Sequence, residues 1–298
     1  MRKNSGDMKM LKHNFISKRF YFEEIRYALS VEFMLLCFNV MIIVCIIPAR
    51  FASTRFPGKV VACLQGKPII QYAYEKAKNS NLVDEVFVAT DDIRIAQVVK
   101  SFGGNVLMTS KSHPSGTDRI AEAVEILKSF GYSIDDDSII INLQADEPFI
   151  RVEMINQLVE LMKKYKNSEP YIGTLVKRIE SIDDFKNPNI VKVVFNSEGY
   201  ALYFSRSPIP FDREKFLKGN SQFSFMYKHI GIYGYPLFLL KKFVSLPQSK
   251  LEIIESLEQL RALENGIKIK VTETQYDSFG IDTPEDLEVA EKCLSIYL

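Results

Sequence analysis

Residues 41–59 read MIIVCIIPARFASTRFPGK, an apolar run followed by a basic loop. The apolar part is rich in β-branched residues and has the length of one strand that is covered on both faces. The loop places two guanidinium groups and one ammonium group, Arg50, Arg55 and Lys59, beyond the carboxyl end of that strand. Three neighbouring cations repel each other unless an anion binds between them, and ligands bind at this edge of open α/β sheets. The stretch therefore predicts a phosphate-binding loop, with a solvated basic loop as the alternative.

The loop lacks the two common glycine-based phosphate motifs. A Walker A motif needs a glycine five positions before Gly58, where Ser53 stands, and no GxGxxG motif occurs in the sequence. Arginine can bind phosphate through two hydrogen bonds, whereas lysine acts as a point charge. Phosphate binding is therefore assigned to the side chains of the loop together with backbone amides.

Beyond this strand, short β-branched runs alternate with amphipathic helices, which is typical of a parallel sheet wrapped by crossover helices. The expected strands are 41–47, 85–90, 106–109 and 138–143, and the expected helices begin near 67, 91, 115 and 155. Beyond about residue 170 the pattern changes, and a hairpin is expected around Asn196–Gly199, within an antiparallel excursion of about 185–235. The remaining expected elements are a strand at 227–235, one helix at 249–264 and a strand at 267–272. The fold class is therefore α/β, with a mostly parallel central sheet.

A second polar cluster follows the expected central strand, where residues 144–148 read QADEP. A carboxylate at the end of this strand can face the basic loop, where it would repel a bound phosphate. Mg²⁺ removes the conflict, because one or two carboxylates hold it together with phosphate oxygens. Asp146 is one candidate ligand, and Asp282, at a helix start marked by Thr283–Asp286, is a candidate second ligand. Surface helix caps are the alternative interpretation of both aspartates.

The composition places the chain among globular proteins. Its 298 residues are 47% hydrophobic and 25% charged, which allows one large or two modest domains with a substantial core. The 38 Lys and Arg side chains nearly cancel the 37 Asp and Glu side chains, so no overall field draws the protein to nucleic acid or to an anionic membrane. The cysteines lack metal-binding spacing and predict buried, reduced thiols, so a cytoplasmic location fits best. They are Cys37, Cys45, Cys63 and Cys293.

Residues 1–40 differ from the rest of the chain, with a basic start that leads into an apolar run at 31–47. Glu32 and Asn39 interrupt this run, no small-residue cleavage site follows it, and its second half is needed as a strand. The hypothesis is that Met41 is the true start and that residues 1–40 form a non-native or disordered extension. A membrane anchor at 1–47 is the alternative.

Taken together, the motifs of residues 41–298 closely resemble those of the 3-deoxy-manno-octulosonate (Kdo) cytidylyltransferases. The matching motifs are Ile47–Arg50, Ser53–Arg55, Pro57–Lys59, Ala89–Asp91, Ser115–Arg119, Gln144–Pro148, Ala201–Arg206, His229–Tyr233, Leu257–Arg261 and Asp282–Asp286. The resemblance implies a Rossmann-like nucleotidyltransferase fold and a homodimer formed through the antiparallel excursion. It also implies a Mg²⁺-dependent reaction of CTP with Kdo that gives CMP-Kdo and pyrophosphate for lipopolysaccharide biosynthesis. The chain departs from the family at Ala145, where the family usually has glycine.

The resemblance also implies a role for each matching residue. The CTP-binding residues are Arg50, Ser53, Arg55, Lys59, Ser115, Gly116 and Arg119, of which the last three lie in the segment that reads cytosine. The metal ligands are Asp146 and Asp282, and the catalytic residues are Lys59, Arg50 and Asp146. The sugar-binding residues are Gln144, Arg206, His229, Tyr233, Glu258 and Gln259.

Several alternatives stay open at the level of sequence. His229 also fits a satisfied core residue, Tyr233 fits strand packing, and a polar helical face with Glu255, Glu258 and Gln259 fits ordinary solvation. A sister enzyme that acts on 8-amino-Kdo or on a sialic acid would keep the loop and metal residues and change the sugar pocket. A non-catalytic nucleotide-binding module is a further alternative, although it would be expected to have lost an aspartate or the lysine.

Overall fold

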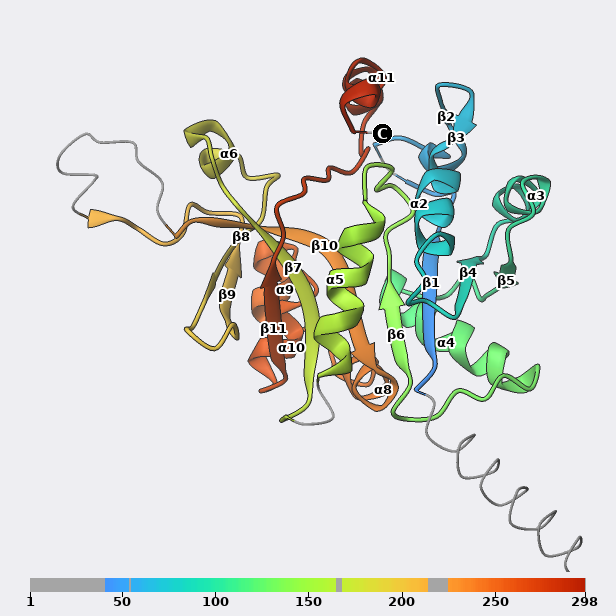
Figure 1. The fold of residues 1–298 in the computed structure, drawn as a ribbon, viewed down its shortest axis with the longest axis horizontal. Coiled ribbons are helices and arrows are strands. Elements are labelled where there is room, and N and C mark those ends of the chain that lie inside the picture. The colour runs from blue at the N-terminus through green and yellow to red at the C-terminus, as the bar shows by residue number, and fades with distance from the viewer. Residues whose placement is uncertain (1–40, 54, 165–167, 214–224, 298) are drawn as a thin grey trace, which may run out of the picture. The chain divides into compact units, whose positions relative to one another are not determined.

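The residues that the structure describes form one nine-stranded mixed sheet, beside a two-stranded ribbon (Figure 1). The structure is a computed structural model that describes residues 41–53, 55–164, 168–213 and 225–297, so the hypothesis about residues 1–40 lies outside it. The main path of the sheet runs in the order β11-β7-β10-β6-β1-β4-β5. These strands are β1 (Ile43–Ala49), β4 (Glu85–Thr90), β5 (Val106–Met108), β6 (Ile139–Asn142), β7 (Tyr171–Arg178), β10 (Tyr227–Pro236) and β11 (Lys268–Glu273).

The sheet is mostly parallel, as the sequence predicts. β1 pairs in parallel with β4 and β6, β4 pairs in parallel with β5, and β11 pairs in parallel with β7. Along this path in the described chain, β10 is the strand that runs antiparallel to its neighbours β6 and β7. The carboxyl ends of β1 and β6 therefore meet at one edge of the sheet, which is where the two predicted polar clusters begin.

Helices cover both faces of the sheet (Figure 1). On one face, α2 (Ile69–Lys78) packs on β1 and β4, and α5 (Val152–Lys163) packs on β7 and β10. On the other face, α4 (Gly116–Ser129) packs on β1, and α8 (Leu237–Val244) packs on β6 and β10. All seven residues of β1 are buried, because side chains alternate between two covered faces.

The helix starts follow the predicted capping chemistry. Asp92 caps α3 (Ile93–Ser101), and its side chain accepts a hydrogen bond from the Arg94 amide. Ser115 caps α4 by accepting a hydrogen bond from the Asp118 amide. Thr283 accepts from the Asp286 amide at the start of α11 (Pro284–Tyr297), while the Asp286 carboxylate accepts from the Thr283 amide. These bonds satisfy amides that have no partner within the helix.

The expected hairpin is present as β8 (Lys192–Phe195) and β9 (Ala201–Ser205) around Asn196–Gly199. Gly199 has φ +81°, a left-handed conformation that glycine adopts without steric cost. β8 also pairs with β10, so the hairpin extends the sheet away from its main path.

Two sequence predictions about this part of the chain are wrong. The single helix expected at 249–264 is broken into α9 (Lys250–Glu255) and α10 (Leu260–Glu264), because Ser256 adopts φ 53° and ψ 48°. The expected polar helical face of Glu255, Glu258 and Gln259 therefore does not exist as one face. Cys45 is buried as predicted, but Cys63 is exposed.

Some elements were not anticipated from the sequence. They are η1 (Lys59–Val61), β2 (Cys63–Leu64), β3 (Lys67–Pro68), β7, α6 (Ile182–Lys186) and α8. Among the helices that the structure describes, none has both the length and the apolar character needed to cross a membrane.

Candidate active site

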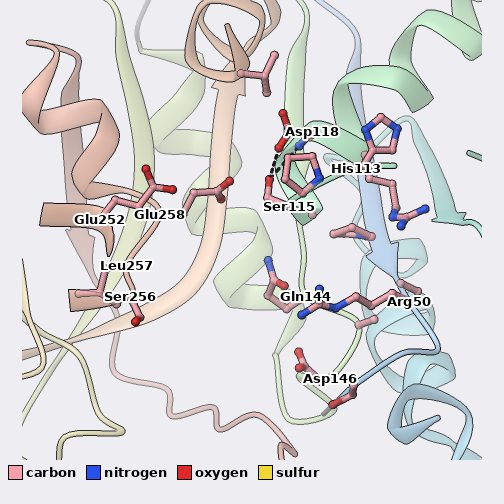
Figure 2. Close-up of a pocket in the computed structure, with 18 of the residues that line it drawn as sticks. Arg50, His113, Ser115, Asp118, Gln144, Asp146, Glu252, Ser256, Leu257 and Glu258 are labelled. Carbon is pink, nitrogen blue, oxygen red and sulfur yellow. Dashed lines mark hydrogen bonds between the residues drawn. The ribbon is translucent and has the colours of Figure 1, made fainter. Parts of the chain in front are cut away.

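A cavity of about 1070 Å³ lies at the carboxyl ends of β1 and β6. Ligand pockets are typically about 300–1,000 Å³, so this one has room for a nucleotide and a second substrate. Arg50 follows β1, Gln144 and Asp146 follow β6, and the segment after α8 supplies the facing wall with Glu258 (Figure 2). The predicted site residues that line the cavity are Arg50, Ser53, Arg55, Lys59, Ser115, Gly116, Arg119, Gln144, Asp146, Glu258 and Asp282.

The basic loop is closed on itself. The Gly58 amide donates to the Phe51 carbonyl at 2.9 Å, and Gly58 has φ +73°. A Cβ atom at residue 58 would lie 2.8 Å from the Phe51 ring, so glycine is needed for this close approach. The guanidinium of Arg94 stacks on the ring of Phe51, with its Cζ atom 3.3 Å from the ring centroid. These contacts fix the shape of the loop, which places Arg50, Arg55 and Lys59 at the cavity without a glycine-based phosphate motif.

Lys59 joins the two predicted metal ligands. Its Nζ atom lies 2.5 Å from Asp146 Oδ2 and 2.6 Å from Asp282 Oδ1, although the two aspartates are 136 positions apart in the sequence. Burial alone would lower the pKa of Lys59, but the charges and hydrogen bonds of both aspartates raise it. Burial would raise the pKa of Asp282, yet Lys59 and Arg55 lower it, the latter through a 2.8 Å ion pair. Lys59 and Asp282 are therefore both charged at neutral pH.

The donor set of this cluster fits a hard divalent cation. Two carboxylates converge on one point, and a cation, the Lys59 ammonium, lies between them. Mg²⁺ is commonly bound by one or two carboxylates with the remaining positions taken by water and substrate phosphates. Within the described ranges, no cluster of three or more His, Cys, Asp or Glu side chains could hold a metal. Both aspartates pair with residues of the basic loop. A cation held by Asp146 and Asp282 would therefore face the phosphate groups of a ligand bound to that loop.

The start of α4 forms another side of the cavity. Gly116 lies close to the end of β1, because a Cβ atom there would be 3.2 Å from the Pro48 ring. Ser115 is occupied as the helix cap and also donates to the Asp118 carboxylate at 2.7 Å. Ser115 and Gly116 thus place the start of α4 at the cavity, and a helix start suits an electron-rich group of a ligand.

Arg119 lines the same side but is engaged by the protein. Its guanidinium lies 3.2 Å from Asp91 Oδ1 and donates to Thr109 Oγ1 at 2.6 Å. It also donates to the Ser110 carbonyl at 3.3 Å. The side chain therefore fixes the segments that follow β4 and β5 against α4.

Glu258 is held within the facing wall by its neighbours. Its Oε2 atom accepts from Thr117 Oγ1 at 2.6 Å. Burial raises the pKa of Glu258, and hydrogen bonds from Thr117 and Ser115 offset this only in part. Among the residues described, Glu258 Oε1 is a buried oxygen without a hydrogen-bond partner, and the Arg261 guanidinium lies 3.8 Å from it. The carboxylate thus has one oxygen whose hydrogen-bonding capacity the protein leaves unused.

Four residues that the resemblance assigns to the sugar do not line the cavity, and their role stays a prediction. Arg206 donates to the backbone carbonyls of Pro188, Glu255 and Ser256 at 3.0, 2.8 and 3.4 Å. Gln259 is 7% exposed and lies in the turn before α10.

The other two, His229 and Tyr233, lie on β10 with their rings 5.2 Å apart. His229 Nε2 is 2.9 Å from Thr174 Oγ1, and the ring packs edge-on against Phe204. Part of His229 remains accessible to solvent, yet the surrounding protein lowers its pKa to about 3 by burial. Burial also raises the pKa of Tyr233. Both side chains are therefore neutral, and a neutral imidazole bonded within the protein matches the core interpretation of His229.

The cavity also contains charged residues that were not singled out from the sequence. Glu252 and Arg261 form a buried pair with contacts of 2.8 and 2.5 Å, and both line the facing wall. Ser249 and Glu252 form a capping box, and this Ser-x-x-Glu spacing was a signal present in the sequence.

His113, directly before the motif at 115–119, bonds to Glu122 at the rim of the cavity. Burial would raise the pKa of Glu122, but hydrogen bonds from His113 and from the Ser110 amide lower it. The sequence around His113 has neither helical nor strand periodicity. Its position beside the motif at 115–119 was therefore the one signal that could have marked it as a residue of the cavity.

A parallel sheet that presents a basic loop and two converging aspartates around a nucleotide-sized cavity has the architecture of a nucleotidyltransferase. Residues 44–269 match the family model described as cytidylyltransferase. The 3-deoxy-manno-octulosonate cytidylyltransferase of Thermodesulfovibrio yellowstonii is 69% identical over 257 residues, covering 86% of this chain and 100% of that protein. The chain therefore belongs to the cytidylyltransferase family, among the 3-deoxy-manno-octulosonate cytidylyltransferases.

Two further proteins agree with this placement. The enzyme of the same name from Geobacter sulfurreducens is 51% identical, covering 85% of this chain and 99% of that protein. A solved structure of CMP:2-keto-3-deoxy-manno-octonic acid synthetase complexed with CTP is 41% identical, with a TM-score of 0.76. It covers 86% of this chain and 100% of that one, so the similarity extends over most of this chain.

Proposed function

We propose that this protein transfers the cytidylyl group of CTP to the anomeric hydroxyl of Kdo, giving CMP-Kdo and pyrophosphate for lipopolysaccharide biosynthesis. The observation that carries the proposal is the meeting of the basic loop with Asp146 and Asp282 in one cavity. Family membership supports both the nucleotide and the sugar acid.

The shape of the cavity supports one orientation of CTP. Arg50, Ser53, Arg55 and Lys59 surround the place for the triphosphate at the end of β1. The backbone at Ser115–Gly116 faces the place for the cytosine ring, and Arg119 supports that segment from behind. The nucleotide would thus lie along the carboxyl edge of the sheet, as ligands do in open α/β folds.

Asp146 and Asp282 are the residues that would hold Mg²⁺. When bound, the ion would neutralise phosphate charge and help to acidify an attacking hydroxyl. The aspartates need the basic loop beside them, because Lys59 keeps them at the cavity and Arg55 restrains Asp282 from the outside.

The chemical step is a direct displacement at the α-phosphorus. The anomeric oxygen of Kdo forms a bond to that phosphorus and loses its proton, while the bond to the β-phosphate oxygen breaks and pyrophosphate leaves. Lys59 and Arg50 would stabilise the negative charge that grows on the phosphate oxygens. Positioning and charge stabilisation dominate such transfers, so no covalent protein intermediate is needed.

The facing wall would bind the sugar acid. Glu258, from the facing wall, and Gln144, from the end of β6, both line the cavity (Figure 2). Both groups can bond hydroxyls of a polyol, and Arg50 lies near enough to the centre of the cavity to attract its carboxylate. Four residues that do not line the cavity would influence sugar binding indirectly, by supporting the residues of this wall. They are Arg206, His229, Tyr233 and Gln259.

We also propose a homodimer formed through the β8–β9 excursion. Large apolar side chains are exposed in this part of the chain, where Leu202 on β9 is 62% exposed and Phe225 before β10 is 76% exposed. Light scattering should give twice the chain mass, and Leu202→Lys should lower it. A cytoplasmic location is proposed because CTP is made there and thiols such as the exposed Cys63 stay reduced.

The experiment that tests the function measures pyrophosphate release from CTP with Kdo, 8-amino-Kdo or a sialic acid, with and without Mg²⁺. Mg²⁺-dependent release with Kdo in preference to the other two sugars supports the proposal. Preference for 8-amino-Kdo or sialic acid would reassign the sugar, and CTP binding without release from any of them would leave only a binding module.

A further inference from the structure

We infer that Glu147 is a positioning residue that fixes the C-terminal strap, residues 277–282, so that Asp282 meets Asp146. The inference rests on the proposed function, because the two aspartates serve as a metal pair only in that reaction. Three kinds of contact join the strap to the loop after β6, and Glu147 makes the one that involves a side-chain hydrogen bond.

The first contact is between backbones. The Ile281 amide donates to the Asp146 carbonyl at 2.9 Å. This bond joins Ile281, the residue before the predicted ligand Asp282, to Asp146, the other predicted ligand. The Ile281 side chain is 0% exposed and packs with Leu64, Ile69 and Phe149, so the strap is anchored in a small core at this point.

The second contact is aromatic. The rings of Phe149 and Phe279 stack with centroids 4.5 Å apart and planes 28° apart. Stacked aromatic pairs contribute about 0.5–1.5 kcal/mol beyond the area that they bury. This pair holds the strap from the side of α5, beyond the loop that starts at Gln144.

The third contact is the hydrogen bond that Ser278 Oγ donates to Glu147 Oε2. The other carboxylate oxygen lies over the backbones of Gly280 and Gly231, because Cβ atoms built there would be 3.5 and 3.9 Å from Glu147 Oε1. Glu147 therefore bridges the loop after β6, the strap and β10. The backbone at residue 280 therefore packs closely on this carboxylate.

The start of the strap is held independently. Asp277 forms an ion pair with Lys228 at 2.8 Å and lies 3.6 Å from Lys177. The strap is thus fixed at Asp277 by β7 and β10, and at Ile281 by Asp146. Without the Glu147 bond, residues 278–280 would keep the hydrogen bond that the Ser278 amide donates to Asp277 Oδ1 at 2.9 Å, which lies within the strap itself. The side-chain hydrogen bond from the strap to the loop after β6 would be lost, and Asp282 follows directly after this part of the strap.

Loss of this bond should weaken metal binding more than turnover. Residues that orient metal ligands typically change metal affinity about 10–100-fold when they are replaced. We expect Glu147→Ala and Ser278→Ala each to raise the half-saturating Mg²⁺ concentration about 10-fold, with little change in turnover at saturating Mg²⁺. Glu147→Gln should stay near wild type, because its amide oxygen can still accept from Ser278.

The test titrates Mg²⁺ in the pyrophosphate assay and, separately, Mn²⁺ by electron paramagnetic resonance in the presence of CTP. Thermal melts check folding, and Ser278→Ala carries the test if Glu147→Ala does not fold. Ser80→Ala is the matched control, because it removes a serine hydrogen bond to Asn156 far from the strap. It should leave both titrations unchanged.

The outcomes separate the inference from the proposed function. Wild-type titrations for both Glu147→Ala and Ser278→Ala would overturn the positioning role. Glu147→Gln as weak as Glu147→Ala, with Ser278→Ala normal, would overturn it too, because the charge of Glu147 would then matter and its bond to Ser278 would not. A wild-type protein that released no pyrophosphate would refute the proposed function, while the Mn²⁺ titrations would still decide the role of Glu147.

Discussion

The two walls of the cavity differ in how far their charged side chains are exposed to solvent. In the phosphate wall, built by the basic loop with Asp146 and Asp282, the side chains of Arg55 and Asp282 are 61% and 47% exposed, and those of Asp146 and Lys59 are 25% and 12% exposed. In the sugar wall, built by residues 244–261, those of Arg261 and Glu252 are only 8% and 6% exposed and bond to each other. The phosphate wall can exchange its internal ion pairs for a ligand, whereas the charged pair of the sugar wall serves to fix its shape. Mutations should therefore affect turnover in the phosphate wall and stability in the sugar wall.

The largest effect is expected for Asp146→Asn. The amide keeps the shape of the side chain but loses the charge that attracts a hard cation. Loss of a single electrostatic contact typically lowers turnover by up to about 10³-fold. Turnover of this variant should fall by more than that, while its melting temperature should stay unchanged. Steady-state assays at saturating CTP and Kdo measure it. Near-normal turnover in a folded variant would remove Asp146 from the metal site.

The next effect lies in the sugar wall, where Arg261→Met should lower the free energy of unfolding by about 3–5 kcal/mol. The cause is the buried carboxylate of Glu252, which would lose its partner. Urea denaturation measures the change. The matched control, Glu252→Gln with Arg261→Met, keeps the bond to the Ser249 amide and should recover most of the loss. Equal loss in both proteins would show that packing, and not the charge, is responsible.

Lys59→Ala comes third, with turnover reduced about 10²–10³-fold and CTP binding changed much less. The reason is that charge on the α-phosphate and on departing pyrophosphate grows during the reaction. Initial rates and equilibrium binding of CTP separate the two quantities. A raised Michaelis constant with unchanged turnover would reduce Lys59 to a binding residue.

The smallest effect concerns His229, behind the sugar wall. Burial lowers its pKa from 6.5 to about 3, so below pH 6.5 the unfolded chain binds a proton that the folded chain does not. Stability should therefore fall with falling pH, by at most about 1.4 kcal/mol per pH unit from this group. His229→Gln should flatten the slope in urea denaturation between about pH 6.5 and 5. Parallel slopes for the two proteins would mean that His229 titrates normally.

The phosphate wall was predictable from the sequence because its signals are local. A buried strand, a basic loop and a carboxylate after the next central strand each occupy one short segment, and parallel pairing brings their ends together. The proposed second ligand, Asp282, was a weaker candidate, since nothing local distinguishes it from a helix-start residue beside Thr283, and the family resemblance strengthened it.

The sugar wall was predicted poorly because its shape depends on tertiary contacts. Ser256 breaks the expected helix in a left-handed conformation that sequence periodicity does not reveal. Glu255, expected on a solvated face, instead accepts from Ser205 at 2.6 Å and from the Arg206 amide at 2.9 Å. Arg206 in turn is bonded to the backbone around this break, which explains why a residue assigned to the sugar lies outside the cavity.

The central claim is that Asp146 and Asp282 share one metal site with the substrate phosphates. A double-mutant cycle of Asp146→Asn and Asp282→Asn, read as turnover over a range of Mg²⁺ concentrations, tests it most directly. The account predicts that the double variant is no worse than the more damaged single variant, because either change already disables the shared site. Losses that multiply in the double variant, with no rescue of either single variant by excess Mg²⁺, would contradict it.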